Sequence, residues 1–282
     1  MNKDFKQNNK FEDIKNFWNE RPCNIKHSNS TFGSKKYFNE IEERRFFVEP
    51  HILEFAQFEK WNNKNVLEIG CGIGTDTINF ARHGANVTSI DLSDKSIEIA
   101  KYRAKIFNLE NKIKFINGNA ECLEDLINNE KKFDLVYSFG VLHHTLNPEN
   151  ILKQIYKFSN SETEIKIMVY NKYSWKALWI LFKYAKFKLW NIKDYIQKYS
   201  EAQIGCPRTL VFSKKELIKL MEKNNFEIQE IQIKHIFKYK IEDYINYRYV
   251  KPLYFRYIPS FLFSYLENKF GWHLCVNMKI KS

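Results

Sequence analysis

The feature that most constrains this chain is a glycine-rich turn between an apolar run and an amphipathic segment. Residues 66–69 are mostly apolar, and Gly70, Gly72 and Gly74 follow at alternate positions before an amphipathic stretch from Asp76 to His83. Glycine permits tight backbone geometry and leaves no Cβ between the main chain and a ligand. A strand, a glycine turn and a helix in this order predict a parallel α/β sheet that binds a ligand at the turn.

A carboxylate at a characteristic distance from this turn indicates what kind of ligand binds there. A second apolar run, residues 86–90, ends on Asp91, 17 residues after Gly74. In nucleotide-binding units, an acidic residue about 20 positions beyond the turn binds the ribose hydroxyls. The spacing G-x-G-x-G differs from a dinucleotide fingerprint, and Glu68 would repel a pyrophosphate. These residues predict a nucleoside cofactor that carries positive charge.

The run from Glu68 to Gly74 resembles motif I of the class I S-adenosylmethionine-dependent methyltransferases. Residues 117–121 stand where that family reads the adenine ring, and residues 133–144 are similar to the fourth-strand motif of its ubiquinone-biosynthesis-type subgroup. The resemblance covers residues 60–172, with a fainter match at 205–233. It implies S-adenosylmethionine as cofactor, S-adenosylhomocysteine as by-product, and methyl transfer to an oxygen or nitrogen of a small molecule.

Apolar runs alternate with amphipathic segments, which is typical of a parallel sheet with crossover helices. We therefore expect an α/β fold with a seven-stranded, Rossmann-like, mostly parallel sheet. The expected strands lie near 65–69, 86–90, 112–116, 133–138, 164–170, 226–233 and 272–280. The expected helices of the core lie near 75–83, 94–107, 121–128, 149–158 and 213–221. Ser93 and Ser213 are expected N-caps, and Glu216 completes a capping box with Ser213.

Additions to this core divide the chain into three parts. They are an N-terminal tail and helical cap (1–58), the cofactor-binding core (59–171), and lid insertions with the C-terminal completion of the sheet (172–282). The first 16 residues are polar, and we expect them to be mobile. Aromatic-rich insertions at 172–199 and 236–270 follow the fifth and sixth strands. Part of each is expected at the carboxyl edge of the sheet, where ligands bind in such folds.

The net charge of +12 is unevenly distributed along the 282 residues. Residues 1–150 contain 21 Lys and Arg against 22 Asp and Glu, whereas residues 151–282 contain 24 against 11. A basic half suits RNA, anionic lipid or an acidic substrate, but lysine-rich composition also produces it without any function. No apolar run is long enough to span a bilayer, and the N-terminus has no signal-peptide core. With five cysteines and no C-x-x-C pair, we expect a reduced, cytoplasmic protein.

The resemblance also implies a set of cofactor-binding residues. They are Glu68, Gly70, Cys71, Gly72, Gly74, Asp91, Leu92, Asn119, Ala120, Glu121 and Phe139. Asp91 is expected to accept hydrogen bonds from both ribose hydroxyls. Asn119 to Glu121 should contact the adenine, with Leu92 against one face of the ring. Glu68 either orients the turn or reaches the ammonium group of the cofactor through water.

His143 and His144 are the candidates for catalysis, because they follow the fourth strand at the ligand edge. A neutral imidazole near the sulfonium could accept a proton as a hydroxyl or amine attacks. Alternatively the pair shapes the loop, because in-line positioning alone accelerates such a transfer greatly. The candidate substrate contacts are Arg21, His27, Tyr37 and Arg45 in the cap, and Tyr170, Tyr173 and Trp175 after the fifth strand. No metal is expected, since no cluster has the sequence spacing of metal ligands.

Three alternatives to small-molecule methylation stay open. The first is an RNA or protein methyltransferase that docks through the basic half; nucleic acid is not favoured, because no RNA-binding module or Asn-Pro-Pro-Tyr-type motif is present. The second is a peripheral membrane enzyme that methylates a quinone or lipid precursor, with residues 175–199 as an interfacial helix. The third is a cofactor-binding module without catalytic activity.

Overall fold

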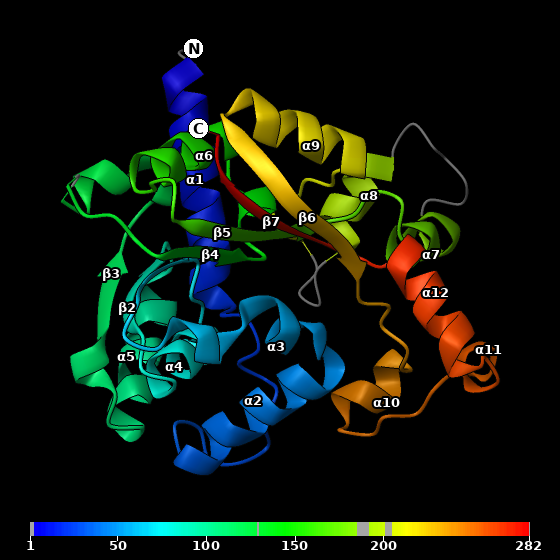
Figure 1. The fold of residues 1–282 in the computed structure, drawn as a ribbon. Helices are drawn as coiled ribbons and strands as arrows, with labels where there is room; N and C mark the ends of the chain where they lie inside the picture. Colours follow the sequence, from blue (N-terminus) through cyan, green and yellow to red (C-terminus); the bar gives the residue numbers. More distant parts are fainter. Residues whose placement is uncertain (1–2, 129, 185–191, 201–204, 282) are drawn as a thin grey trace.

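The protein folds around one seven-stranded sheet with the order β3-β2-β1-β4-β5-β7-β6 (Figure 1). The computed structural model describes residues 3–128, 130–184, 192–200 and 205–281. The strands are β1 (Asn65–Ile69), β2 (Asn86–Asp91), β3 (Ile113–Asn117), β4 (Leu135–Phe139), β5 (Glu164–Tyr170), β6 (Phe226–Lys234) and β7 (His273–Ile280). Strands β1 to β5 are parallel, and β7 pairs antiparallel with both β5 and β6. The predicted Rossmann-like, mostly parallel sheet is confirmed.

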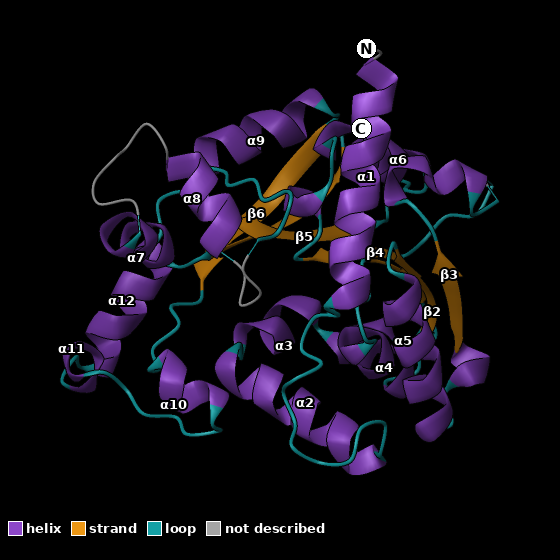
Figure 2. Cartoon of the chain, turned by 180° about the vertical axis from the view of Figure 1, so that it is seen from behind, coloured by secondary structure: helices purple, strands orange, loops and turns teal. Residues whose placement is uncertain are grey.

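Helices cover both faces of the sheet, as Figure 2 shows from behind. The α-helices are α1 (Lys3–Glu20), α2 (Lys35–Val48), α3 (His51–Ala56), α4 (Thr75–Arg82), α5 (Asp94–Ile106), α6 (Pro148–Lys157), α7 (Trp175–Lys183), α8 (Ile192–Tyr199), α9 (Lys214–Lys223), α10 (Ile241–Ile245), α11 (Leu253–Arg256) and α12 (Ser260–Phe270). Short 3₁₀ helices are η1 (Phe58–Trp61), η2 (Glu110–Lys112), η3 (Ala120–Asp125) and η4 (Leu142–His144). None of the helices in the described part of the chain has the length and apolarity needed to cross a membrane.

Alternate residues of the strands enter two apolar layers, one on each face of the sheet. Val66 of β1 packs with side chains of α3 and α4, such as Ile52 and Ile78. Its neighbour Leu67 packs on the opposite face with α6 and α9, where Leu152 is fully buried. Because both faces are covered, the central strands are almost continuously buried. This burial holds the carboxyl ends of β1, β2, β4 and β5 at one edge.

The expected helix caps are present. The Ser93 side chain accepts a hydrogen bond from the backbone N–H of Ser96 at the start of α5. Ser213 and Glu216 form the expected capping box at the start of α9. These local hydrogen bonds satisfy backbone N–H groups that no intrahelical carbonyl can reach.

The N-terminal residues expected to be mobile belong to helix α1, which extends from Lys3 to Glu20. Ile14 and Phe17 are buried, which gives the otherwise polar helix an apolar side. The end of α1 is tied to the start of α5: Asn19 Oδ1 accepts from Ser93 Oγ at 2.8 Å, and Lys15 pairs with Asp94 at 3.0 Å. The polar composition of this segment did not indicate a helix, because the contacts that stabilise α1 are made with α5, which is distant in the sequence.

Two further expectations differ in detail from the structure. The helix expected at 121–128 is the shorter 3₁₀ helix η3, interrupted at Cys122 by a non-helical backbone (φ −133°, ψ 50°). The aromatic segment at 175–199, expected as a lid helix over the pocket or as an interfacial helix, contains two helices, α7 and α8. Its residues 185–191 lie outside the described part of the chain.

Candidate active site

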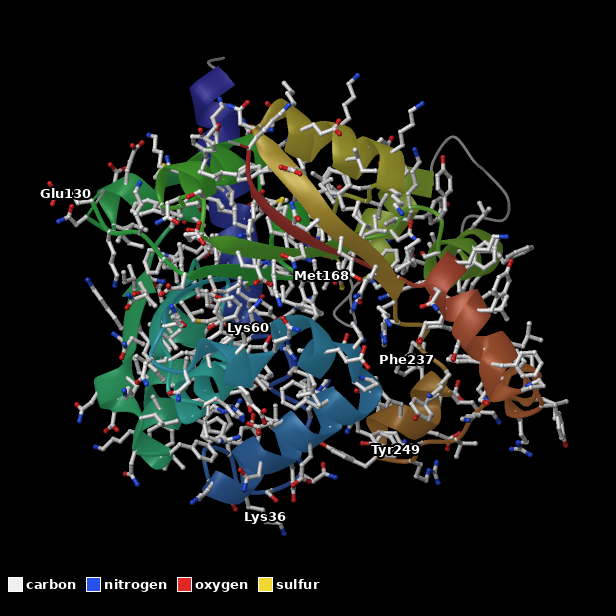
Figure 3. All side chains as sticks on the ribbon, in the orientation of Figure 1. Lys36, Lys60, Glu130, Met168, Phe237 and Tyr249 are labelled. Carbon is white, nitrogen blue, oxygen red and sulfur yellow. The ribbon has the colours of Figure 1, made fainter. Side chains whose placement is uncertain are left out.

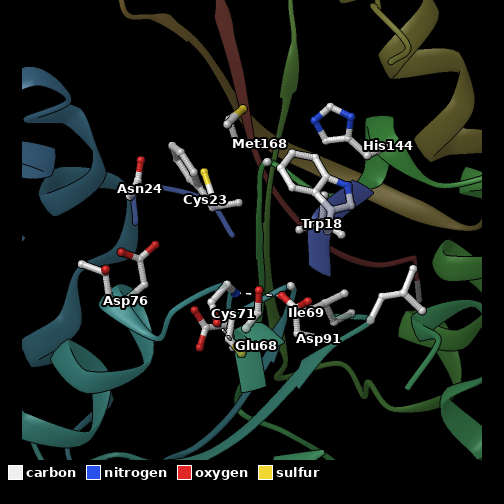
Figure 4. Close-up of a pocket in the computed structure, with 18 of the residues that line it drawn as sticks. Trp18, Cys23, Asn24, Glu68, Ile69, Cys71, Asp76, Asp91, His144 and Met168 are labelled. Atoms are coloured by element: carbon white, nitrogen blue, oxygen red, sulfur yellow. Dashed lines mark hydrogen bonds between the residues drawn. The ribbon is translucent and has the colours of Figure 1, made fainter. Parts of the chain in front are cut away.

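A cavity of about 350 Å³ lies at the carboxyl edge of the sheet. It is lined by the ends of β1, β2, β4 and β5, by α1 and α2, and by residues at the ends of β6 and β7. Figure 4 shows Asp91 and Cys71 on one side of this cavity, with Trp18 and His144 across from them. The cavity therefore has two parts, a glycine-turn side over β1 and β2 and a far side over β4, β5 and β7.

The three motif glycines all have left-handed backbone conformations, but each is required for a different structural reason. A Cβ on Gly70 (φ +80°) would lie 2.0 Å from Cγ2 of Val141, so this position accepts no side chain. A Cβ on Gly72 (φ +52°) would meet nothing within 4 Å, because the residue borders the cavity. Gly74 is the N-cap of α4, and a Cβ there would be 3.1 Å from Ala100. Gly74 thus allows α4 and α5 to pack closely against each other, whereas Gly70 and Gly72 line the cavity.

Asp91 is held at the end of β2 by backbone groups on both sides. Its Oδ2 accepts from the Gly72 N–H at 2.8 Å, and its Oδ1 accepts from the Ser93 N–H at 2.8 Å. Burial raises the pKa of Asp91, and these backbone hydrogen bonds oppose that rise. A carboxylate has about four acceptor positions, so two remain for groups in the cavity. Asp91 is therefore fixed in position beside the open face of Gly72.

The other residues expected at the cofactor end divide into lining and supporting groups. Cys71, Leu92, Asn119, Ala120, Glu121 and Phe139 all line the cavity. The side chain of Asn119 caps η3 by accepting from the Glu121 N–H at 2.9 Å. Glu121 Oε1 accepts from the backbone N–H groups of Leu146 and Asn147, each at 3.1 Å. Glu121 therefore supports the loop after η4 with one oxygen.

Glu68 is buried beneath the turn and joins three elements of the core. Its Oε2 accepts from Ser89 Oγ of β2 at 2.8 Å and from Thr77 Oγ1 of α4. Burial, and to a lesser extent the charge of Asp76, raises the pKa of Glu68 to about 7. These contacts favour the role in which Glu68 orients the glycine turn. Glu68 is also one of the residues that line the cavity.

The structure adds to the site an ion pair that no sequence pattern indicates. Arg45 of α2 pairs with Asp76 of α4 at 2.8 Å, and Tyr137 Oη donates to the same Asp76 oxygen at 3.1 Å. Both charged residues line the cavity. The other oxygen of Asp76 has no hydrogen-bond partner among the described residues. Asp76 thus presents an unused acceptor at the boundary between the two sides of the cavity.

The two histidines after β4 have different surroundings. His143 is fully buried against Tyr170, with ring centroids 3.7 Å apart, and its ring nitrogens have no hydrogen-bond partner in the described chain. Burial holds the pKa of His143 well below its ordinary value. His144 lines the cavity, and its Nδ1 lies 2.8 Å from the carbonyl oxygen of Arg208. Because that oxygen only accepts, Nδ1 donates in this hydrogen bond, which orients the ring in the cavity wall.

The seven candidate substrate contacts are not gathered in one place. His27, Arg45 and Tyr170 line the cavity, and burial together with Arg44 and Arg45 lowers the pKa of His27 to about 4. The remaining four, Arg21, Tyr37, Tyr173 and Trp175, lie outside the cavity lining within the described chain.

Each of these four outer side chains makes a local contact or faces solvent. The Tyr37 hydroxyl donates to the Ile25 carbonyl at 2.5 Å. The Arg21 guanidinium lies 5.2 Å from the Phe17 ring. Tyr173 is 64% exposed, and Trp175 packs near the aromatic rings of α11.

Sequence reasoning missed several cavity residues because distant segments supply them. Trp18 comes from α1, and Lys176 and Phe237 come from the two insertions, as was expected of part of each. His235 and His273 stand at the far ends of β6 and β7 and also line the cavity. No local motif marks any of these residues.

Comparisons with known proteins show the family to which this chain belongs. A family model described as a methyltransferase domain matches residues 40–231. Ubiquinone biosynthesis O-methyltransferases are among the relatives: that of Coxiella burnetii strain RSA 493 is 33% identical over 90 residues, 32% of this chain and 36% of its own length. That of Pelagibacter ubique is 28% identical over 207 residues, 72% of this chain and 79% of its own. The chain thus spans about a third of the length of the first of these relatives.

Solved structures share the fold over nearly the whole chain. The magnesium protoporphyrin IX methyltransferase of Synechocystis PCC 6803 with bound S-adenosylhomocysteine has a TM-score of 0.59 at 13% identity, covering 95% of this chain and 98% of that one. An S-adenosylmethionine-dependent methyltransferase of Clostridium acetobutylicum has a TM-score of 0.54 at 10% identity, covering 88% and 99%. The family match extends over more than half of the sequence, so this chain belongs to the methyltransferase domain family, with the class I S-adenosylmethionine-dependent fold.

Proposed function

We propose that this protein transfers the methyl group of S-adenosylmethionine to an oxygen or nitrogen of a small molecule and releases S-adenosylhomocysteine. The observation that carries the proposal is the Asp91 carboxylate, fixed by the Gly72 and Ser93 amides next to an open glycine. Two acceptor positions on a fixed carboxylate suit the two hydroxyls of a ribose. Leu92, Asn119 and Ala120 border the adjoining space, where an adenine would lie.

The residues present fit this cofactor along the glycine-turn side. The methionine portion would pass Gly70 and Gly72, where a side chain would block the backbone. The open oxygen of Asp76 suits the ammonium group, and the guanidinium of Arg45 suits the carboxylate. When bound, the cofactor supplies an electrophilic methyl group on a sulfonium. The far side of the cavity would then hold the acceptor.

His144 is the residue we assign to proton removal from the acceptor. Its Nδ1–H group donates to the Arg208 carbonyl, which holds the imidazole in the cavity wall, and an imidazole is the side chain best suited to accept a proton near neutral pH. Trp18 packs edge-on to this ring with centroids 5.2 Å apart, and helix α1 covers this part of the cavity. The aromatic lining by Trp18, Tyr170 and Trp272 suits an acceptor with a ring.

The test is transfer of a radiolabelled methyl group from S-adenosylmethionine into a cell extract, separated into metabolite, lipid, RNA and protein fractions. We expect label in the metabolite fraction with the wild-type protein and none with a Gly72→Val variant, whose side chain occupies the cofactor position. Label in RNA or protein would contradict the small-molecule assignment. Absence of label from all fractions, with S-adenosylhomocysteine still bound, would favour the module without activity.

A second candidate, a peripheral membrane enzyme acting on a quinone or lipid precursor, is favoured by one surface. Figure 3 shows side chains of α11 and α12 projecting outward. Phe261 and Tyr257 are 77% and 76% exposed, and Lys251, Arg256 and Lys269 are exposed beside them. Aromatic and basic side chains together suit an anionic bilayer surface. Co-sedimentation with anionic vesicles that is lost in a Tyr257→Ser/Phe261→Ser variant would support this reading, and equal binding by the variant would contradict it.

A further inference from the structure

Three potential metal ligands converge on the far wall of the cavity, away from the glycine turn. Glu49 is the C-cap of α2, His235 directly follows β6, and His273 begins β7. One donor atom of each lies within 4.8 Å of the other two. Glu49 Oε1 is 3.9 Å from His235 Nε2 and 3.7 Å from His273 Nε2. All three residues line the cavity.

We propose that Glu49, His235 and His273 bind a divalent transition-metal ion such as Zn²⁺. Two imidazoles and one carboxylate are the protein ligands of many catalytic zinc sites, which leave one coordination position open. Tetrahedral coordination with bonds of about 2.1 Å places ligand atoms about 3.4 Å apart. The two distances from Glu49 exceed that separation by about half an ångström or less, and the two histidine donor atoms lie within 4.8 Å of each other. Small side-chain rotations would complete the site.

A fourth histidine supports the orientation of His273. His51 Nε2 lies 3.0 Å from His273 Nδ1. When His273 carries its proton on Nδ1, it donates to His51 and directs the lone pair of Nε2 toward Glu49. Metal-ligating histidines characteristically donate their second ring N–H in this way, which fixes both the tautomer and the ring. His51 is therefore a positioning residue for the site.

The backbone at His235 adopts an uncommon conformation. His235 has φ +72°, in the left-handed region that residues other than glycine rarely adopt. The Trp272 N–H donates to the His235 carbonyl at 2.8 Å, which holds this conformation beside the start of β7. Strained backbone of this kind concentrates at functional sites. At His235 this backbone conformation occurs where the ring lies beside Glu49 and His273.

The position of the site indicates which molecule the ion would contact. The sheet order places β1 and β2 on one side of β4, and β5, β7 and β6 on the other. The ion would therefore lie on the acceptor side, with its open position toward the cavity. Its ligand would be an acceptor carrying a hydroxyl or carboxylate oxygen, which the ion would hold and orient. This role rests on the proposed methyl transfer, whereas metal binding itself does not.

The experiment is a titration of the full-length protein, first treated with a chelator, with Co²⁺ followed by visible absorption and with Zn²⁺ followed by calorimetry. We expect one equivalent to bind to the wild type and the tetrahedral Co²⁺ bands to appear. Glu49→Gln and His235→Asn should each weaken binding by at least about tenfold. Asparagine is chosen because it tolerates positive φ, so the backbone at position 235 is preserved. His83→Ala, at a half-exposed histidine near Glu59, is the matched control and should bind as the wild type does.

Binding of S-adenosylhomocysteine by the same variants separates the two proposals. Retained S-adenosylhomocysteine binding in Glu49→Gln and His235→Asn would show that the variants are folded, so their loss of metal would support the site. A wild-type protein that binds no metal but binds S-adenosylhomocysteine would overturn the metal site and leave the proposed function standing. Metal binding that His235→Asn and Glu49→Gln leave unchanged would place the ion elsewhere and also overturn the inference.

Discussion

The two sides of the cavity are built in opposite ways. On the glycine-turn side, Gly70, Gly72 and Asp91 come from one strand–helix–strand unit, and the Asp91 carboxylate reaches the Gly72 amide across 19 positions of sequence. On the far side, the hydrogen bond between His51 and His273 joins residues 222 positions apart. The centre of the first side is a single local unit, whereas the second side depends on the cap, both insertions and the last strand coming together.

This difference suggests how such an enzyme can change its acceptor while keeping its cofactor. The residues proposed to bind the cofactor lie at the ends of strands with both faces covered, so their positions are determined largely by the core. Residues that face the acceptor come from connecting segments and termini, which tolerate substitution and insertion without disturbing the sheet. The far side is therefore where this chain would differ most from its relatives.

The largest expected effect tests how rigid the glycine-turn side is. Gly70→Ala should destabilise the protein by about 3 kcal/mol or more, because the Cβ meets Val141 at 2.0 Å and the φ of +80° is strained for alanine. Gly72→Ala in the same turn meets no atom within 4 Å and should cost only about 1 kcal/mol. Denaturant unfolding of both variants measures the contrast. Equal stability losses would mean that the turn is not as closely packed as the Val141 contact indicates.

The next effect concerns the far side and separates the two histidines. His144→Ala should lower the rate of methyl transfer about 100-fold or more if its imidazole accepts the proton. His143→Phe removes no hydrogen bond made within the described chain and keeps a ring against Tyr170, so its rate should stay within a few-fold of the wild type. Transfer of labelled methyl to the acceptor found in the extract measures both. A drop of only a few-fold for His144→Ala would leave positioning as the main source of rate.

The sequence predicted the glycine-turn side well and the far side poorly, for a physical reason. A buried parallel strand, a glycine turn and a carboxylate are linked by local geometry, so their spacing carries the information. Tyr170 and Arg45 were selected by residue type and do line the cavity, but so were Tyr173 and Trp175, which point elsewhere. Glu49, His235 and His273 have no common spacing, and only the antiparallel return of β7 brings them together. The helix at α1 was missed because its stabilising contacts lie on α5.

A third prediction concerns the pH dependence of stability on the glycine-turn side. The folded-state pKa of Glu68, raised to about 7 mainly by burial, exceeds its ordinary value of 4.5. The folded protein therefore binds more protons than the unfolded chain between these values, and this residue makes stability fall as pH rises from about 4.5 to about 7. Glu68→Gln keeps an oxygen for Ser89 and Thr77 but cannot ionise. Its stability relative to wild type should increase between pH 5 and pH 8 by up to about 3 kcal/mol.

Thermal or denaturant unfolding at several pH values measures this difference. A Glu124→Gln variant is the matched control, because hydrogen bonds from Lys157 and Gln154 lower the pKa of that exposed carboxyl group rather than raise it. The relative stability of Glu124→Gln should not increase with pH. A flat profile for Glu68→Gln would mean that Glu68 stays ionised in the folded protein at low pH.

The smallest expected effect tests whether the fixed carboxylate at Asp91 serves the cofactor. Asp91→Asn keeps one oxygen to accept from the Gly72 or Ser93 amide, whereas Asp91→Ala leaves both amides without their partner. Each should weaken S-adenosylhomocysteine binding by about 1–3 kcal/mol, with alanine at the upper end, because charge-assisted hydrogen bonds to the ribose are lost. Calorimetry with the purified variants measures this directly. Since the metal-ligand candidates lie on the far side, Asp91→Asn should leave Co²⁺ binding unchanged; an unchanged S-adenosylhomocysteine affinity would instead remove Asp91 from the cofactor site. If both ligands weaken together, the two sides of the cavity are coupled and are not the independent parts that their construction implies.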